Sequence, residues 1–417
     1  MAAVIATATL APALAAAAPS TIPAALGDHL RTAPRLLGDP GGRRTALERA
    51  GLTPSLFYNH FLGVLADGGR DDHTRARQSA TGDFFLHANL DRALPWTGAE
   101  ALLQVKGGYG VNVNRAAGAL SDPIDDADGD TTYIPQLWIQ QSVLDGKVAL
   151  RAGYLDQQIT LDRNAYANSE DRQFLATFLD NDNPAVPLAI GLGATLFLSP
   201  TDGLDVILGT ADAETRRFSA GFDTAFDGWT SLFGYLEIDR HVQIASARGA
   251  RAGTYRFGLV WDPRTKERFA AAAGGASAGA ATASGDAGFY LSFDQMLYRS
   301  SAGGPQGLGA FARYGYRDPA VNRVTHFWSA GVQYHGPLAA RPGDVVGLGV
   351  YQAHLSADFR ETHAGETARE SGVECYYAAQ VLPWLTITPD AQVIAAPGAA
   401  RAADTAVVLG IRWRLTF

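Results

Sequence analysis

The last segment of the chain restricts the possible folds most strongly, because its side chains alternate between two faces. In Thr405–Phe417 one face carries only large apolar residues, while the other combines two arginines with small and polar residues. A period of two predicts a β-strand. A soluble β-sandwich would place the apolar stripe in its core, so this strand alone does not distinguish a sandwich from a membrane barrel. The apolar face consists of Val407, Leu409, Ile411, Trp413, Leu415 and Phe417, and the other carries Arg412, Arg414 and Thr416 with Ala406, Val408 and Gly410.

The same alternation recurs along most of the chain. It appears in Asp83–Asp91, Ala99–Lys106, Lys147–Asp156 and Trp384–Val393, each with one apolar face and one polar face. In a lipid bilayer every backbone polar group needs a partner within the protein, so strands can span it only as a closed barrel. Repetition of the pattern predicts an all-β, transmembrane, antiparallel β-barrel. A terminal Phe, here Phe417, is typical of strands in outer-membrane barrels.

Composition agrees with a barrel and excludes several other classes. Hydrophobic residues make up 47% of the chain and the mean hydropathy is −0.04, which fits strands that face lipid on one side only. After the first twenty residues no run approaches the roughly 18 apolar residues of a spanning helix. The net charge of −8 argues against nucleic acid as a partner. A single cysteine, Cys375, rules out an internal disulfide framework.

Three segments are expected. Residues 1–18 read as a signal peptide, with an apolar region and small residues before the cleavage site but without the usual basic start. The alternative is an Ala-rich helix of the mature protein. Residues 19–54 are predicted to be a periplasmic lead-in with a short amphipathic helix at Arg43–Ala50. Residues 55–417 are predicted to form the barrel.

Connections of alternating length support this organisation. Short turns are predicted at Asp145–Gly146, Pro200–Gly203, Asp227–Gly228 and Leu382–Pro383, and long polar loops at Ala66–Ala80, Asn114–Asp130, Gln157–Pro187, Pro263–Asp286 and Ser356–Glu370. Barrels combine short periplasmic turns with long outer loops and have an even number of strands. About seventeen strands are recognised, so one assignment between Leu204 and Trp261 is in error. Sixteen strands are predicted, with eighteen as the alternative.

The connection Gln157–Pro187 is counted as the third outer loop, which in general porins folds inward and narrows the pore. It combines charges with Tyr166, Phe174 and Phe178, a mixture that suits sugars, whose hydroxyls need hydrogen bonds and whose C–H faces stack on rings. The alternative is a surface loop with ordinary solvated charges. Its candidate constriction residues are Asp162, Arg163, Asp171 and Arg172, and Asp180 and Asp182 are further charges of the loop.

Charged or large polar residues on strands are predicted to face the bore, because a charge at lipid depth costs roughly 2–4 kcal/mol. A solvated wall position without substrate contact is the alternative for each of them. The candidate substrate-contacting residues are Glu100, Lys106, Trp138, Arg151, Asp156, Asp294, Arg313, Glu374, Asp390, Arg412 and Arg414.

No catalytic, metal or cofactor site is expected. Gly275–Gly279 matches the G-x-S-x-G pattern of a nucleophile elbow, but it lies in an Ala/Gly-rich run that reads as a loop. The acidic run Asp122–Asp130 could chelate calcium, although a solvated outer loop explains it better. His87 and Ser142 are both predicted to face inward, but nothing in the sequence pairs them. A barrel enzyme and a structural or adhesion barrel are therefore kept as alternatives.

Five segments in order resemble the carbohydrate-selective outer-membrane porin family (OprB-type). They are GDPGGRRTALERAGL (Gly38–Leu52), LWIQQSVLDGKVALRAGYLD (Leu137–Asp156), the stretch Phe311–Val350 with Arg341-Pro342-Gly343-Asp344, ECYYAAQVLPWLTITPDAQVIAAPG (Glu374–Gly398) and VVLGIRWRLTF (Val407–Phe417). The resemblance implies a sixteen-stranded barrel in the outer membrane of a Gram-negative bacterium that passes glucose and similar sugars without energy input. The Ala/Gly run after Arg268 departs from the family pattern.

The functional expectation is passive, carbohydrate-selective diffusion, with a general non-specific porin as the main alternative. The expected partners are monosaccharides or small oligosaccharides, outer-membrane lipid and lipopolysaccharide, and the barrel-assembly machinery through the C-terminal strand. No nucleic acid partner and no cofactor are expected.

Overall fold

The computed structural model describes residues 30–70, 75–126, 129–186, 190–214, 232–269, 282–300 and 304–417. The predicted signal peptide 1–18, the turn Asp227–Gly228 and the Gly275–Gly279 motif lie outside these ranges. Among the described residues, no helix has the length and apolar character to cross a membrane.

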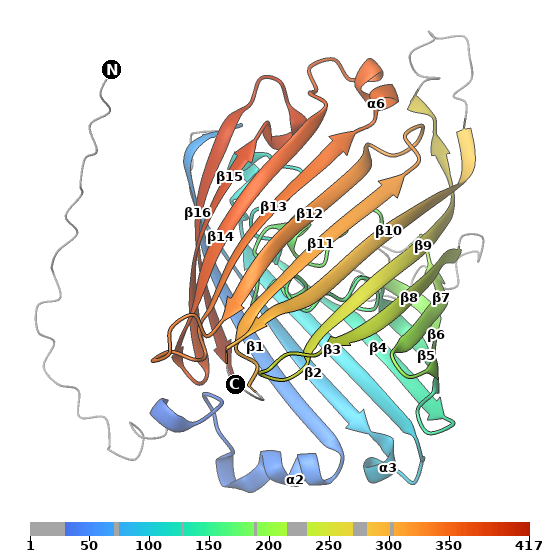
Figure 1. The fold of residues 1–417 in the computed structure, drawn as a ribbon, viewed down its shortest axis with the longest axis vertical. Coiled ribbons are helices and arrows are strands. Elements are labelled where there is room, and N and C mark those ends of the chain that lie inside the picture. Colours follow the sequence, from blue (N-terminus) through green and yellow to red (C-terminus); the bar gives the residue numbers. More distant parts are fainter. Residues whose placement is uncertain are drawn as a thin grey trace, which may run out of the picture.

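Sixteen antiparallel strands form one closed barrel, as predicted (Figure 1). Each strand pairs with its neighbours in the sequence, and β1 pairs with β16 to close the ring. Between Leu204 and Trp261, where the sequence leaves the strand count ambiguous, the described residues include parts of three strands. The strands are β1 (Leu52–Gly69), β2 (Ala76–Asn89), β3 (Ala99–Gly110), β4 (Thr131–Val143), β5 (Val148–Asp156), β6 (Ile190–Thr201), β7 (Leu204–Asp212), β8 (Leu232–Ile244), β9 (Arg251–Glu267), β10 (Thr282–Arg299), β11 (Gly307–Arg317), β12 (Val324–His335), β13 (Val345–Leu355), β14 (Arg369–Leu382), β15 (Leu385–Ala395) and β16 (Asp404–Thr416).

The apolar face of β16 lies on the outside of the barrel and its polar face on the inside, as the alternation predicts. Leu409 is 48% exposed on the outer surface, whereas Arg412 is fully buried on the inner side. Other strands also carry exposed apolar side chains on the outside, among them Leu150 and Val393. This outer apolar surface is what a lipid-embedded barrel requires, since lipid-facing and bore-facing residues alternate.

Short and long connections segregate to opposite ends of the barrel. One end holds tight turns such as 202–203 and 383–384, together with α3 (Leu90–Ala93) and the C-terminus. The opposite end holds the longer loops, with α4 (Asn114–Ala117), α6 (Ala357–Thr362) and η3 (Pro397–Ala399). The first is the periplasmic end and the second the outer end.

Several strands extend further outward than the sequence pattern indicated. β1 runs to Gly69 and β2 starts at Ala76, so Ala66–Ala80 is not a long loop, and β9 and β10 continue into the predicted loop Pro263–Asp286. Their polar composition is explained by position, because strands above the bilayer are solvated on both faces. Cross-strand ion pairs hold this extension together, for example Lys266 with Asp286 at 2.9 Å.

The lead-in is tied to the periplasmic end. It contains η1 (Pro40–Gly42) and α2 (Arg43–Arg49), and β1 follows from Leu52 rather than Ser55. The Asp39 carboxylate accepts from the backbone N–H of Arg44 at 2.8 Å, which satisfies a donor of the first helical turn. The Arg44 guanidinium donates to the main-chain oxygen of Phe417 at 3.2 Å, so the lead-in contacts the end of the last strand.

Candidate functional site: the constricted bore

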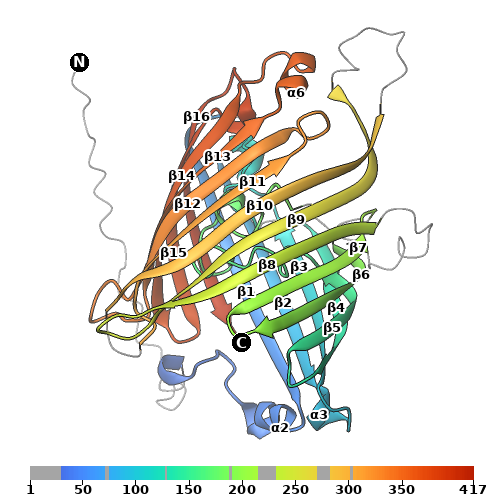
Figure 2. The same cartoon turned by 45° about the vertical axis from the view of Figure 1, so that its right-hand side comes forward.

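The connection between β5 and β6 folds into the barrel, where it is visible as the green loop within the ring of strands in both views (Figures 1 and 2). We call its described part, residues 157–186, loop L3. It contains the short helix η2 (Thr177–Leu179). Residues 187–189, before β6, lie outside the described ranges.

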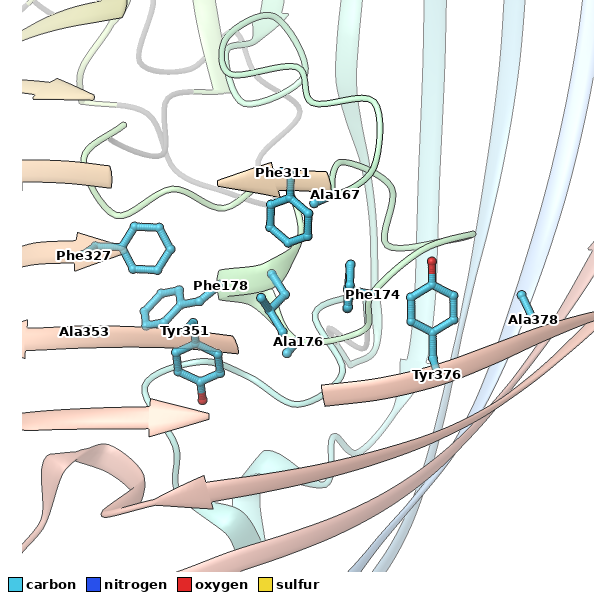
Figure 3. Close-up of a cluster of buried hydrophobic side chains, with 11 residues drawn as sticks. Ala167, Phe174, Ala176, Phe178, Phe311, Phe327, Tyr351, Ala353, Tyr376 and Ala378 are labelled. Atoms are coloured by element: carbon cyan, nitrogen blue, oxygen red, sulfur yellow. The ribbon is translucent and has the colours of Figure 1, made fainter. Parts of the chain in front are cut away.

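Aromatic side chains of L3 pack against the inner wall (Figure 3). Phe174 meets Tyr376 of β14 edge-on with ring centroids 5.0 Å apart, and Phe178 meets Tyr351 of β13 at 5.5 Å. Both phenylalanines are buried. Edge-to-face contacts between aromatic rings add to the free energy gained by burying them. This cluster therefore fixes L3 to the wall formed by β11–β14.

Glycines in the wall allow the loop to approach closely. A Cβ at Gly349 of β13 would lie 2.9 Å from side-chain atoms of both Phe174 and Leu179, which is shorter than a van der Waals contact. At Gly309 of β11 a Cβ would overlap the ring of Tyr166. The loop therefore packs directly on the backbone of the strands.

Buried charged side chains of the wall also bond to L3 and hold it in place. Arg313 of β11 forms an ion pair with Asp162 at 3.0 Å and donates to the main-chain oxygen of Asp180 at 2.5 Å. Glu374 of β14 accepts from the N–H groups of Leu175 at 2.6 Å and Ala176 at 2.9 Å. A buried loop must have its backbone groups satisfied, and these wall residues satisfy them.

The last strand supplies two further anchors. Arg412 donates to the main-chain oxygens of Glu170 at 2.6 Å and Gln173 at 3.1 Å. Arg414 forms an ion pair with Asp171, with Nε and Oδ2 2.6 Å apart. Both arginines are therefore engaged by L3.

A second loop also folds inward, contrary to the expectation of a solvated acidic run at Asp122–Asp130. We call its described part, residues 111–126, loop L2. Asp126 is buried and pairs with Lys106, and the N–H of Asp125 donates to the oxygen of Leu175 at 2.9 Å. The apolar Ile124 within the acidic run packs in a buried cluster with Phe61 and Leu175. This apolar residue explains why the run lies inside the barrel.

The wall also anchors L2. Glu370 of β14 accepts from the N–H groups of Leu120 at 2.6 Å and Ser121 at 3.0 Å. L2 and L3 bond to each other as well, since Thr177 N–H donates to the Asp122 oxygen at 3.0 Å. The two loops form one unit against the wall from β11 through β16 to β1.

The inner side of β3 to β6 carries polar groups that stay accessible beside these loops. The guanidinium of Arg151 lies 4.1 Å from the ring centroid of Trp138 and 4.9 Å from that of Phe197, so it is held between two aromatic rings. Its Nε donates to Gln140 at 3.1 Å, and Gln140 donates to Glu100 at 2.7 Å. From L3 the exposed Arg163 lies within electrostatic reach of Arg151. These groups line the space beside L3.

Below L3 the bore opens into a cavity of about 960 Å³ at the periplasmic end, which we call the vestibule. L3 contributes Asn168, Asp171 and Arg172 to its lining, and the lead-in contributes Pro34 and Arg35. A solute that passes L3 crosses this cavity before it reaches the periplasm.

The predicted site residues thus fall into three groups. Those that join the wall to L2 or L3 are Lys106, Asp162, Asp171, Arg313, Glu374, Arg412 and Arg414, of which Lys106 and Asp171 stay partly exposed. Those on accessible bore surfaces are Glu100, Arg151 over Trp138, Arg163 and Arg172. The remaining three bond elsewhere on the inner side: Asp156 accepts from Gln158 N–H, Asp294 pairs with Arg256, and Asp390 accepts from Gln392.

Several inner polar residues were not singled out from the sequence. Besides Glu370 and Asp126, they include Glu237 of β8, which accepts from the N–H of Asp162 at 2.8 Å, and Asp239, which lies 3.7 Å from Arg256. The acidic residues Glu237 and Asp239 alternate with apolar ones along β8. This alternation could have identified Glu237 and Asp239 as inward residues, but it lies in the region where the strand count was ambiguous.

Two of the alternative site chemistries can be compared with the described part of the chain. His87 bonds to Glu100 at 2.8 Å, a contact between neighbouring strands. Within the same ranges, no group of three or more His, Cys, Asp or Glu side chains is placed to hold a metal ion.

A sixteen-stranded barrel with an apolar outer surface and a polar bore narrowed by inward loops defines a porin of the Gram-negative outer membrane. The family described as "Carbohydrate-selective porin, OprB family" matches residues 73–417. The chain belongs to this family, which confirms the resemblance noted in the sequence.

Individual relatives agree with this assignment. The chain is 24% identical to "Porin B" of Pseudomonas aeruginosa over 92% of its own length and 91% of that protein. Its fold matches OprB of Pseudomonas putida in its high-pH structure with a TM-score of 0.84 at 22% identity, covering 93% of this chain and 100% of the other. The low-pH structure of the same protein gives a TM-score of 0.60 at 20% identity, with 93% and 99% covered.

Proposed function

We propose that this porin lets glucose and similar small sugars diffuse passively across the outer membrane, with no covalent step. The observation that carries the proposal is the guanidinium of Arg151 held between Trp138 and Phe197, beside the inward loop L3. A polar group presented at a fixed position next to aromatic rings suits a sugar, which has hydroxyls on its edges and C–H groups on its faces.

The arrangement supports recognition by L3 and the β3–β6 wall together. Arg163 extends from L3, and Arg151, Gln140 and Glu100 form a hydrogen-bonded row on the wall. The buried anchors keep L3 in place, so the width of the passage is fixed by the fold. The buried charges contribute to selectivity by positioning the loop, and the accessible ones by contacting the sugar.

The surroundings of the barrel follow from its outer surface and its last strand. We propose that the exposed apolar residues contact outer-membrane lipid and lipopolysaccharide. The strand β16, with Trp413 facing outward and Phe417 at its end, is the segment that the barrel-assembly machinery would recognise.

Swelling of liposomes that contain the protein tests this proposal. Glucose is expected to enter faster than sucrose and faster than a charged solute of similar size that is not a sugar. Replacing Arg151 by Gln is expected to slow glucose entry more than entry of a non-carbohydrate solute of equal size. Arg92→Gln is the matched control, because Arg92 is exposed on the periplasmic helix α3. Swelling that depends on size alone would indicate a general porin, and its absence for all solutes would exclude a porin.

A further inference from the structure

The vestibule has a chemistry that differs from that of the passage beside L3. Its lining includes the arginines Arg35, Arg172 and Arg414, the side-chain carboxylate of Asp171 and the terminal residue Phe417. Amides and aromatic rings complete it, among them Asn168, Gln333, Gln380, Phe57 and Trp384.

The side-chain carboxylate and the Phe417 oxygen of the vestibule are already paired. Asp171 accepts from Arg414 Nε at 2.6 Å and also from the hydroxyl of Ser169. The main-chain oxygen of Phe417 accepts from Arg44. The lining thus sets one carboxylate, that of Asp171, against three arginines, and Arg35 and Arg172 give the cavity an excess of positive charge.

Arg172 is the more accessible of these two arginines. Its side chain is 62% exposed, and its Nε lies 3.5 Å from Asp171 Oδ2, which is an ion-pair distance rather than a close hydrogen bond. Within the described ranges, no residue accepts a hydrogen bond from its guanidinium. The group lies 5.8 Å from the ring centroid of Phe57, so it is positioned beside an aromatic surface.

The lead-in brings Arg35 to the same cavity. Leu36 N–H donates to the Thr416 oxygen at 2.8 Å, and the Trp384 indole donates to the Leu30 oxygen at 2.7 Å. These two bonds hold the segment on both sides of Arg35 against the periplasmic ends of β15 and β16. Arg35 itself lies 3.8 Å from Glu48, again without a close hydrogen bond.

We propose that the vestibule is a second carbohydrate subsite that selects sugar acids, with the carboxylate between Arg172 and Arg35. The hydroxyls of the sugar would bond to Asn168, Gln333 and Gln380, and its ring would face Phe57. Guanidinium groups bind carboxylates with paired, charge-assisted hydrogen bonds, which distinguishes an acid from a neutral sugar of the same shape. The subsite rests on the proposed function only in requiring that sugars reach the periplasmic end of the bore.

The test compares glucuronate with glucose, since the two differ by a carboxylate in place of a hydroxymethyl group. Single channels are recorded in planar bilayers with either sugar in both compartments, and the dissociation constant is taken from the concentration dependence of current block. We expect the dissociation constant of glucuronate to be about tenfold lower than that of glucose. Arg172→Gln and Arg35→Gln should each raise the dissociation constant of glucuronate about tenfold. Arg172→Lys, which keeps the charge, should retain part of the preference.

Arg248→Gln is the matched control, because Arg248 is an exposed arginine of the periplasmic turn 245–250 outside the vestibule lining. It should leave both sugars unchanged. Equal dissociation constants for the two sugars in the native protein would overturn the subsite, as would equal effects of Arg172→Gln on both. Heat-modifiable mobility of each variant in electrophoresis shows that it has folded. Failure of glucose to permeate at all would instead reject the proposed function, so the two failures are distinguishable.

Discussion

Arg414 of the last strand and Asp171 of L3 form an ion pair on the inner side of the barrel, with Nε and Oδ2 2.6 Å apart. They are separated by most of the barrel sequence, and their contact connects the strand that closes the barrel with the loop that narrows it. Arg414 also lies 4.3 Å from the ring centroid of Phe57 on β1, so its guanidinium is fixed from two sides.

Breaking this pair is predicted to widen the passage. Arg414→Gln leaves the Asp171 carboxylate without its main partner. The segment of L3 around Asp171 should then move away from the wall. We expect higher single-channel conductance for Arg414→Gln and for Asp171→Asn. A double-mutant cycle of unfolding free energies should give a coupling of about 0.5 to 3 kcal/mol. Additive effects of the two substitutions would show that the pair contributes nothing.

Glu374 is predicted to keep Leu175 and Ala176 of L3 bonded to the wall. Its carboxylate accepts two backbone N–H groups, and Gln at this position has only one acceptor oxygen, so one N–H loses its partner. Amide hydrogen exchange at Leu175 and Ala176 should accelerate about tenfold or more in Glu374→Gln. Glu361→Gln, on the exposed surface of α6, is the control. Unchanged exchange at both amides would contradict this role.

A methyl group at Gly349 is predicted to disturb the contact of L3 with β13. It would lie 2.9 Å from Phe174 and Leu179, so Gly349→Ala should lower the free energy of unfolding by about 1 to 3 kcal/mol. Gly234→Ala on β8 is the matched control, because a Cβ there meets nothing within 4 Å. Urea unfolding of the refolded protein in micelles measures both. Equal stability of the two variants would indicate that L3 tolerates the displacement.

The periplasmic turn at Asp344 is predicted to weaken in acid. Burial alone would raise the pKa of Asp344, but hydrogen bonds from Arg341 and Tyr377 outweigh it and hold the pKa below its usual range. A carboxyl with a lowered pKa in the folded state stabilises the protein above its unfolded pKa, near 4, and this stabilisation is lost as pH falls through the folded pKa.

Asp344→Asn should therefore lower the thermal unfolding temperature at pH 7 and have a smaller effect at pH 3. The loss of heat-modifiable mobility in electrophoresis is a convenient measure. Asp91→Asn, on the exposed helix α3, is a comparison variant at the same end of the barrel. A difference between native protein and Asp344→Asn that does not shrink in acid would contradict the assignment.

The barrel could be predicted from the sequence because lipid and water impose opposite demands on alternate side chains. The two faces of β16 are the clearest case, since Leu409 and Arg412 lie where the period of two puts them. The predicted bounds of the strands were less accurate at the outer end of the barrel. There a strand is solvated on both sides, and residues such as Lys266 read as loop although they pair across strands.

The roles of the inward charges could not be predicted to the same extent. Arg151 and Arg313 are both inward arginines on strands, but Arg313 is buried against L3 whereas Arg151 stacks between aromatic rings. The environments of the two arginines differ only because L3 passes one of them and not the other. The alternation of side chains within a strand does not predict the path of L3. The inward fold of L2 was missed because its carboxylates suggested solvent, while Ile124 among them determines its burial.

Pairing of β1 with β16 has a consequence for the assembly of the channel. The N–H of Phe417 donates to the oxygen of Leu56, and β16 pairs with β1, so the ring closes between the first and the last strand. Arg412 and Arg414, which hold L3, belong to that same segment. A barrel without β16 would have two open sheet edges and would lack these two anchors of L3, so the channel reaches its working diameter only when the ring has closed.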